Sequence, residues 1–151
     1  MRYSSDYVET FEYVEDDYTL KVDPALLGRK KSADRSGGFS IAMSVLSILG
    51  SIILMICALV YAFSLIGAFS IDNPLKVLLI GGCAFAFSLL TLILAKANIG
   101  KALDSELETD NAKGAVVASN FAVTLFLIMM FAFIIIGLIY NWPILMNLIK
   151  R

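Results

Sequence analysis

The sequence predicts an all-α membrane protein with three transmembrane helices and a polar N-terminal tail. Hydrophobic residues make up 59% of its 151 residues and its mean hydropathy is +0.82, whereas a soluble domain is about 45–50% apolar. The charged residues leave three uncharged runs, 39–71, 77–95 and 115–149. About 20 apolar residues in a helix span the roughly 30 Å hydrocarbon layer of a bilayer. Each run therefore predicts one membrane-spanning helix.

The first span is predicted near residues 40–69. Its uncharged run is longer than a bilayer requires, so we expect a tilted or protruding helix. Ser36-Gly37-Gly38 precedes it and predicts a flexible joint, and Asp72-Asn73-Pro74 follows it as a turn.

The second and third spans are predicted near residues 76–96 and 115–140. Ile99, Leu103 and Leu107 recur at helical spacing, which indicates that the second helix continues past the membrane. Asp110 or Asn111 is the expected N-cap of the third helix. Asn141-Trp142-Pro143 is expected to interrupt that helix. Tyr140 and Trp142 would then lie in the interfacial belt, with residues 144–149 along the membrane surface.

The N-terminal tail, residues 1–38, is predicted to be separate from the membrane domain, residues 39–149. Residues 1–23 are acidic and tyrosine-rich. Residues 10–22 alternate about an acidic turn as a small β-hairpin would, while helical spacing of the aromatic residues fits a helix equally well. Both interpretations stay open. In either case we expect the tail to dock on a cytoplasmic partner, through Tyr7, Phe11, Tyr13 and Tyr18.

The distribution of Lys and Arg predicts the orientation, because cytoplasmic flanks of membrane spans are enriched in both. One side carries seven such residues, with Arg29, Lys30, Lys31 and Arg35 next to the first span, and the other side carries three. The tail and the loop 96–113 should therefore face the cytoplasm and the C-terminus the outside. The same basic cluster is a candidate for contact with anionic lipid headgroups.

Small residues line one face of each predicted helix. Such faces allow helices to approach closely in lipid, where hydrophobic burial does not drive association. They serve either packing within this chain or contact with another subunit. The candidate helix-packing residues are Ser40, Ser44, Ser47, Ser51, Gly81, Ala84, Ser88, Gly114, Ala118 and Ala122.

The sequence offers no pattern typical of catalysis or of cofactor or metal binding. Histidine is absent, and Cys57 and Cys83 lie in apolar runs without partners at metal-ligand spacing. No charge lies within the three runs, whereas ion-coupled transporters usually place charges at membrane depth. Asn120 is the most polar residue inside a span and is expected to form a hydrogen bond between helices. We therefore predict no enzyme, no cofactor, no metal site and no nucleic-acid partner.

The layout from Ser40 onward resembles a bacterial family of small multi-span membrane proteins of unknown function. The matching stretches are residues 41–50, IAMSVLSILG, and 113–119, KGAVVAS. The resemblance implies a multi-pass protein of the bacterial plasma (inner) membrane, and it implies no known activity or site.

These observations lead to two functional hypotheses. The first is a non-enzymatic accessory or scaffolding subunit of a larger membrane protein complex, whose partners are the bilayer and other membrane subunits. The alternative is a homo-oligomeric channel or transporter subunit, in which the serine face of the first span would line the path.

Overall fold

Three long helices make up the structure, a computed structural model that describes residues 24–103 and 109–150. They are α2 (Pro24–Leu65), α3 (Pro74–Leu103) and α4 (Asp110–Ile149). Each is long and apolar enough to cross a membrane, and no strand occurs in the described residues. The predicted all-α class with three candidate spans is therefore confirmed. The proposed hairpin or helix of the tail, with Tyr7, Phe11, Tyr13 and Tyr18, lies outside the described residues.

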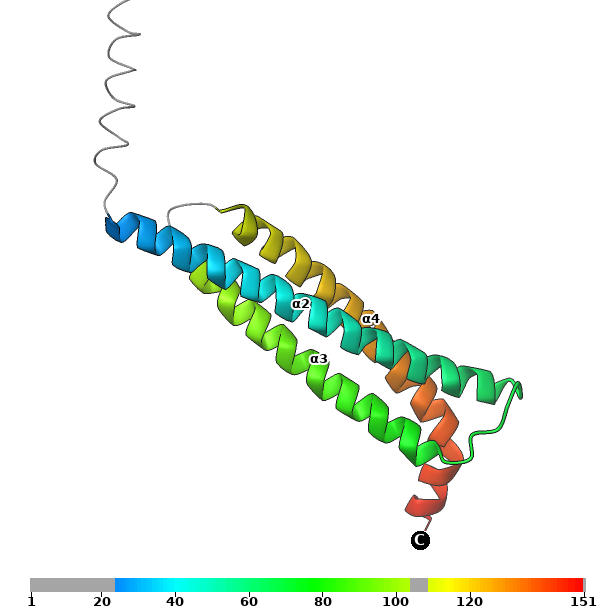
Figure 1. The fold of residues 1–151 in the computed structure, drawn as a ribbon. Helices are drawn as coiled ribbons and strands as arrows, with labels where there is room; N and C mark the ends of the chain where they lie inside the picture. Colours follow the sequence, from blue (N-terminus) through cyan, green and yellow to red (C-terminus); the bar gives the residue numbers. More distant parts are fainter. Residues whose placement is uncertain (1–23, 104–108, 151) are drawn as a thin grey trace, which may run out of the picture.

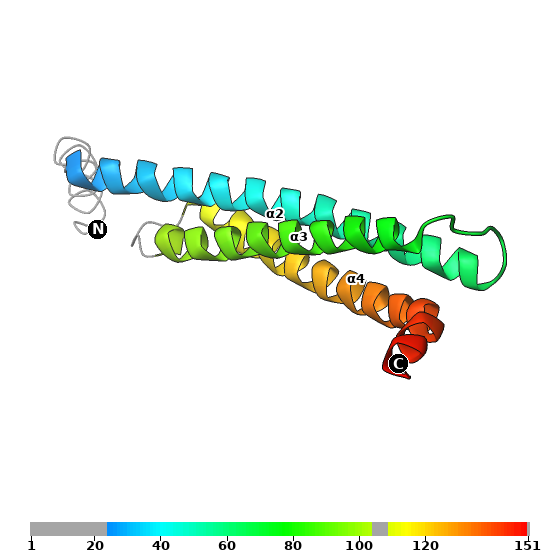
Figure 2. The same ribbon diagram turned by 90° about the horizontal axis from the view of Figure 1, so that it is seen from below.

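The helices form an elongated bundle in which α2 packs against both other helices (Figures 1 and 2). Ser40 lies beside Ala95 and Tyr61 beside Pro74, so α2 and α3 are antiparallel. Gly37 lies beside Ala112 and Gly137 beside Tyr61, so α2 and α4 are parallel. The N-terminus of α2 and the C-terminus of the chain therefore lie at opposite ends of the bundle.

Helix α2 continues through the segment predicted to be a flexible joint. It has 42 residues, about 63 Å at 1.5 Å per residue, and it includes Ser36, Gly37 and Gly38. A Cβ on Gly37 would lie 2.9 Å from the backbone carbon of Asn111 in α4. Glycine is a poor helix former, but here its missing side chain allows two helix backbones to touch. Tertiary packing thus keeps this segment helical, and the helix crosses the predicted domain boundary at residue 38.

The first helix also ends earlier than predicted, at Leu65 instead of near residue 69. Gly67 has a φ of 78°, the left-handed conformation that glycine adopts at little cost. Its N–H donates to the Ser64 carbonyl, and the N–H of Ala68 donates to the Phe63 carbonyl. These two bonds form a Schellman motif that ends the helix. Gly67 lies within the uncharged run 39–71, which hydropathy alone assigned to the span.

Helix α3 begins at the predicted turn and runs past its expected span. Pro74 occupies the first helical position, where its missing N–H costs nothing. The side-chain oxygen of Asn73 accepts a hydrogen bond from the N–H of Lys76. The helix extends to Leu103, as the spacing of apolar residues beyond residue 96 predicts.

Helix α4 differs from its prediction at both ends. Its N-cap is Thr109, whose hydroxyl accepts a hydrogen bond from the N–H of Ala112; Asp110 and Asn111 are already in the helix. At the other end the helix continues through Pro143 to Ile149 and changes direction there (Figure 2). A proline inside a helix removes one hydrogen bond and favours a bend, but lipid-exposed helices tolerate it.

Candidate functional site: the serine seam, the tyrosine contact and the basic end

A seam of hydroxyl groups joins α2 to α3 in the middle of the bundle. We call it the serine seam, and its members are Ser40, Ser44, Ser47 and Ser51 of α2 with Ser88 and Thr91 of α3. All four α2 serines and Ser88 are fully buried. The predicted serine face of the first span is thus in contact with the chain's own second helix.

Ser88 makes the closest contacts in the seam. Its hydroxyl donates to the Ser47 carbonyl at 2.6 Å, and the Ser47 hydroxyl donates to the Ser88 carbonyl at 3.2 Å. The Ser51 and Ser88 hydroxyl oxygens are 3.3 Å apart. A Cβ on Gly50 would lie only 2.7 Å from the Ser88 oxygen. The small side chains therefore allow close backbone approach and reciprocal hydrogen bonds at the same place.

Further hydrogen bonds satisfy most of the remaining hydroxyl groups. Ser40 donates to the Ala95 carbonyl of α3 at 2.9 Å. Ser44 donates to the carbonyl of Ser40, four residues earlier in its own helix, a common arrangement for serine in membrane helices. Among the described residues, the buried Ser119 hydroxyl of α4 has no partner. The seam is thus an internal polar contact within the apolar bundle.

The other predicted packing residues also lie between the helices. Gly81 is buried against the ring of Phe133, which occupies the space where a Cβ would be built. Ala84 and Ala122 belong to the buried core. Gly114 and Ala118 are half-buried, and the side chain of Ile41 lies near Gly114. The small-residue faces are therefore used in packing within this chain.

A tyrosine that the sequence analysis did not identify joins all three helices near the 66–73 loop. Tyr61 is fully buried, and its hydroxyl donates to the Pro74 carbonyl of α3 at 2.9 Å. Its ring centroid lies 4.9 Å from that of Tyr140 and 6.2 Å from that of Phe133, both in α4. Tyr140 is half-buried and packs against the core, while Trp142 is exposed; their location in the interfacial belt stays a prediction.

One sequence feature could have indicated the role of Tyr61: it is a single tyrosine in the middle of an uncharged run. A buried phenol usually needs a hydrogen-bond partner. The sequence did not indicate that this partner is the first carbonyl of the next helix.

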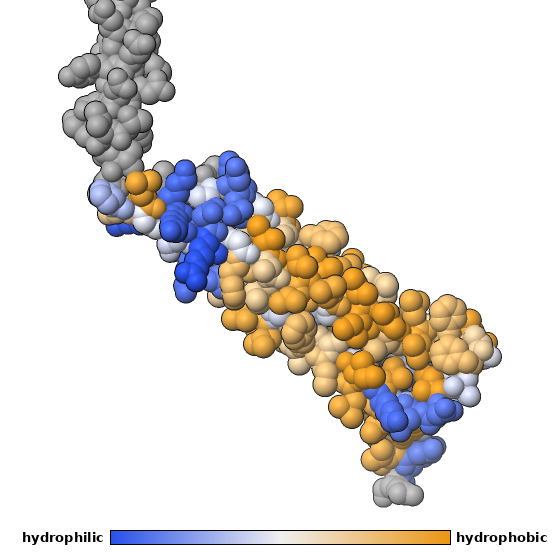
Figure 3. Space-filling model, in the orientation of Figure 1, coloured by the Kyte–Doolittle hydropathy of each residue, from blue (hydrophilic) through white to orange (hydrophobic). Residues whose placement is uncertain are grey.

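Exposed positive charge gathers at the end of the bundle where α2 and α4 begin. We call this region the basic end, and Figure 3 shows hydrophilic residues gathered there. Its exposed basic residues are Arg29, Lys30, Lys31, Arg35, Lys96, Lys101 and Lys113. The opposite end, with loop 66–73 and the last turns of α4, is the loop end. The basic cluster predicted from the sequence therefore lies on a helix together with basic residues from the other two helices.

The basic end is a packed extension of the bundle. Asn111 donates its side-chain N–H to the Asp34 carboxylate at 2.8 Å, which links α4 to α2. Ala33, Ala102 and Ala112 are buried there, one from each helix. All three helices thus continue as one body past the apolar region.

Asn120 forms the interhelical hydrogen bond predicted for it. Its side-chain oxygen accepts from the ammonium group of Lys96 at 2.8 Å, which joins α4 to α3. This contact places a charged residue of α3 beside the most polar position of the third span, near the basic end.

Groups of three or more potential metal ligands do not occur within residues 24–103 and 109–150. Cys57 is buried and Cys83 is exposed, and both are free thiols. Comparisons of the chain with protein-family models, with curated proteins and with solved structures found no match.

Proposed function

We propose that this chain is a non-enzymatic accessory or scaffolding subunit of a larger membrane protein complex. In this proposal the bundle spans the bacterial inner membrane three times, with the basic end and the N-terminal tail in the cytoplasm. The C-terminus is then outside the cell.

The observation that carries the proposal is the packed extension at the basic end. Residues 24–38 of α2 precede the apolar run and continue the helix for about 22 Å. The headgroup region adds only about 5–8 Å to each side of the hydrocarbon layer. The extension therefore projects beyond the headgroups, with exposed cations on helices fixed by the Asp34–Asn111 contact. A rigid charged projection suits a protein partner, because a preformed surface loses little entropy on binding.

The burial of the seam supports the same choice over the alternative of a serine-lined channel. The four α2 serines have no exposed surface in this bundle. Oligomerisation with its helices in this arrangement would expose aliphatic and aromatic side chains to the neighbouring copies instead.

Purification in a mild detergent, followed by mass measurement of the intact assembly, tests this proposal. We expect the full chain to copurify with a different membrane protein at a fixed ratio. Deletion of residues 1–22 removes most of the acidic tail while retaining α2, and we expect it to reduce the recovered partner at least several-fold. The double variant Lys30→Gln/Lys31→Gln, which changes charges at the basic end, should also reduce the recovered partner. The double variant Lys76→Gln/Lys150→Gln, which changes two charges at the loop end, is its matched control and should retain the partner.

Two outcomes would contradict the proposal. One is a pure homo-oligomer of this chain, which would favour the channel or transporter hypothesis. The other is an unchanged amount of partner after the tail is deleted, which would exclude docking through the tail.

A further inference from the structure

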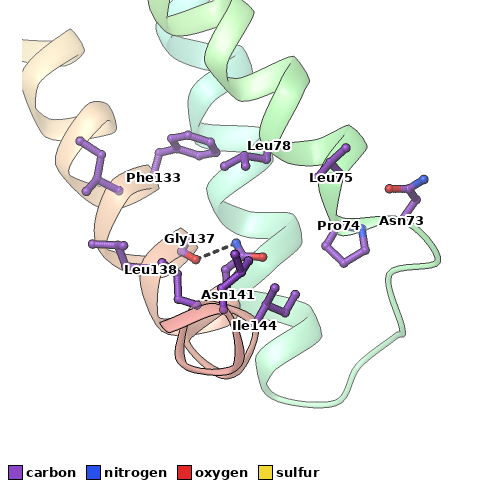
Figure 4. A pocket seen from close by; sticks show the side chains of 12 residues that line it. Asn73, Pro74, Leu75, Leu78, Phe133, Gly137, Leu138, Asn141 and Ile144 are labelled. Atoms are coloured by element: carbon purple, nitrogen blue, oxygen red, sulfur yellow. Dashed lines mark hydrogen bonds between the residues drawn. The ribbon is translucent and has the colours of Figure 1, made fainter. Parts of the chain in front are cut away.

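An apolar groove lies between the beginning of α3 and the second half of α4, at the loop end (Figure 4). Its volume is about 550 Å³, within the range of small-molecule sites in proteins. Side chains of Asn73 and Asn141 provide the polar groups of its lining. The complete lining is Asn73, Pro74, Leu75, Leu78, Phe133, Ile134, Gly137, Leu138, Asn141, Ile144, Leu145 and Leu148.

Fixed contacts hold the walls of this groove apart. At its deep end the Phe133 ring fills the space beside Gly81, so α3 and α4 touch there. Tyr61 binds the Pro74 carbonyl and therefore fixes the start of α3 to α2. On the other wall, the Asn141 side chain donates to the Gly137 carbonyl at 2.8 Å, and the last turns of α4 change direction (Figure 2). The groove is thus bounded by packed residues on both sides.

The chemistry and the depth of the groove restrict what fills it. Leu78, Ile134 and Leu138 are between 43% and 49% exposed and belong to helices that are apolar enough to cross a membrane. Apolar cavities do not retain water. The groove therefore suits an apolar occupant from the hydrocarbon layer.

The shape of the groove favours a flexible occupant over another helix. Along α4 the groove extends from Phe133 to Leu148, which is about four helical turns. The last turns of α4 change direction (Figure 2). A flexible hydrocarbon chain can follow the whole lining, whereas a straight helix would contact only part of it.

We propose that this groove binds one acyl chain of a membrane phospholipid as a resident lipid. The chain end lies against Phe133, and the acyl chain runs along Leu78 and Leu138 toward the loop end. This inference needs the membrane location of the bundle but does not depend on a protein partner.

Photolabelling of the purified full chain tests the proposal. The chain is reconstituted in vesicles of phosphatidylethanolamine and phosphatidylglycerol that contain a phospholipid with a diazirine near the end of one acyl chain. Labelled positions are then mapped by peptide mass spectrometry. We expect several-fold more labelling at Leu78, Ile134 and Leu138 than at Leu90 and Ile128, which are at least as exposed but lie outside the groove.

A groove-filling variant provides the second measurement. Ile134→Trp puts a large ring into the groove and should reduce labelling of Leu78 and Leu138 to the level of Leu90. Ile128→Trp, on the same helix but outside the groove, should leave the labelling pattern unchanged. Should Ile134→Trp not fold, Leu138→Trp with labelling read at Leu78 replaces it.

Three results would overturn the proposal. Equal labelling of groove and non-groove positions would mean that only ordinary surrounding lipid contacts the groove. Crosslinks between two copies of this chain at Leu78 or Ile134 would mean that a second copy occupies it. Labelling that persists in both filling variants would place the lipid elsewhere. Because purified protein alone is used, failure here is separate from failure to find a protein partner.

Discussion

Replacement of Ser88 by leucine is expected to weaken the contact between α2 and α3 by about 3 kcal/mol. Overpacking of a tight site costs about 1–3 kcal/mol, and the space here is limited by Gly50, whose Cβ position is 2.7 Å from the Ser88 oxygen. The substitution also removes the bond to the Ser47 carbonyl, and interhelical hydrogen bonds in membranes contribute about 0.6 kcal/mol on average. Leucine is more apolar than serine, so a simple hydropathy argument predicts the opposite effect.

The reactivity of Cys57 with a thiol reagent measures this effect. Cys57 is buried in the bundle core, so it reacts only when the helices separate. In a Cys83→Ala background and in mild detergent, Ser88→Leu should increase its reaction rate about a hundredfold, since 1.4 kcal/mol corresponds to a factor of ten. Ala86→Leu is the matched control, because Ala86 is exposed on the same helix; its rate should not change. An equal rate in both variants would show that the serine seam does not hold the two helices together.

Replacement of Tyr61 by alanine is expected to destabilise the loop end by about 3 kcal/mol or more. Truncation of a buried aromatic residue to alanine costs about 3–5 kcal/mol, and this ring contacts Tyr140 and Phe133 of α4. The hydrogen bond to the Pro74 carbonyl is lost as well. Tyr61→Phe retains the ring and loses only the hydroxyl, so about 1 kcal/mol or less is expected.

Hydrogen exchange of the backbone amides in residues 66–73 and in the first turns of α3 measures this effect. We expect faster exchange there in Tyr61→Ala and little change near the serine seam at Ser47 and Ser88, because the damage is local. Phe63→Ala is the control, since Phe63 is 48% exposed on the membrane face of the same helix. Exchange that increases equally in Phe63→Ala and Tyr61→Ala would contradict the role of Tyr61 in joining the helices.

The three helices could be predicted from the sequence because a charged side chain within the hydrocarbon layer costs much free energy. Each span therefore appears in the sequence as a run without charged residues. The ends of the helices could not be predicted equally well. The end of α2 depends on Gly67, whose φ of 78° terminates the helix inside an uncharged run. Conversely, Gly37 stays helical because the α4 backbone packs against it. Both outcomes depend on conformation and tertiary contact, which hydropathy does not report.

The sequence predicted which small residues share one face of a helix, but it did not predict which residues of two helices contact each other. Spacing placed Ser47 and Ser51 on one side of the first helix, and the structure shows that Ser88 of α3 is their partner. The pairing requires the antiparallel register of the two helices, which helical spacing does not specify. The apolar groove was not predicted for the same reason, because it arises from the relative positions of α3 and α4 near Pro143.

The orientation of the chain in its membrane is tested most directly by cysteine labelling in intact cells. In a Cys57→Ala/Cys83→Ala background, a membrane-impermeant maleimide is applied to cells that carry Ser32→Cys, Asn73→Cys or Lys150→Cys. Three spans with the basic end in the cytoplasm predict labelling of the variants at positions 73 and 150 in intact cells, and at position 32 only after lysis. Labelling at position 32 but not at position 150 in intact cells would show the reverse orientation. Labelling at both positions would contradict three membrane spans, because an odd number of spans places them on opposite sides.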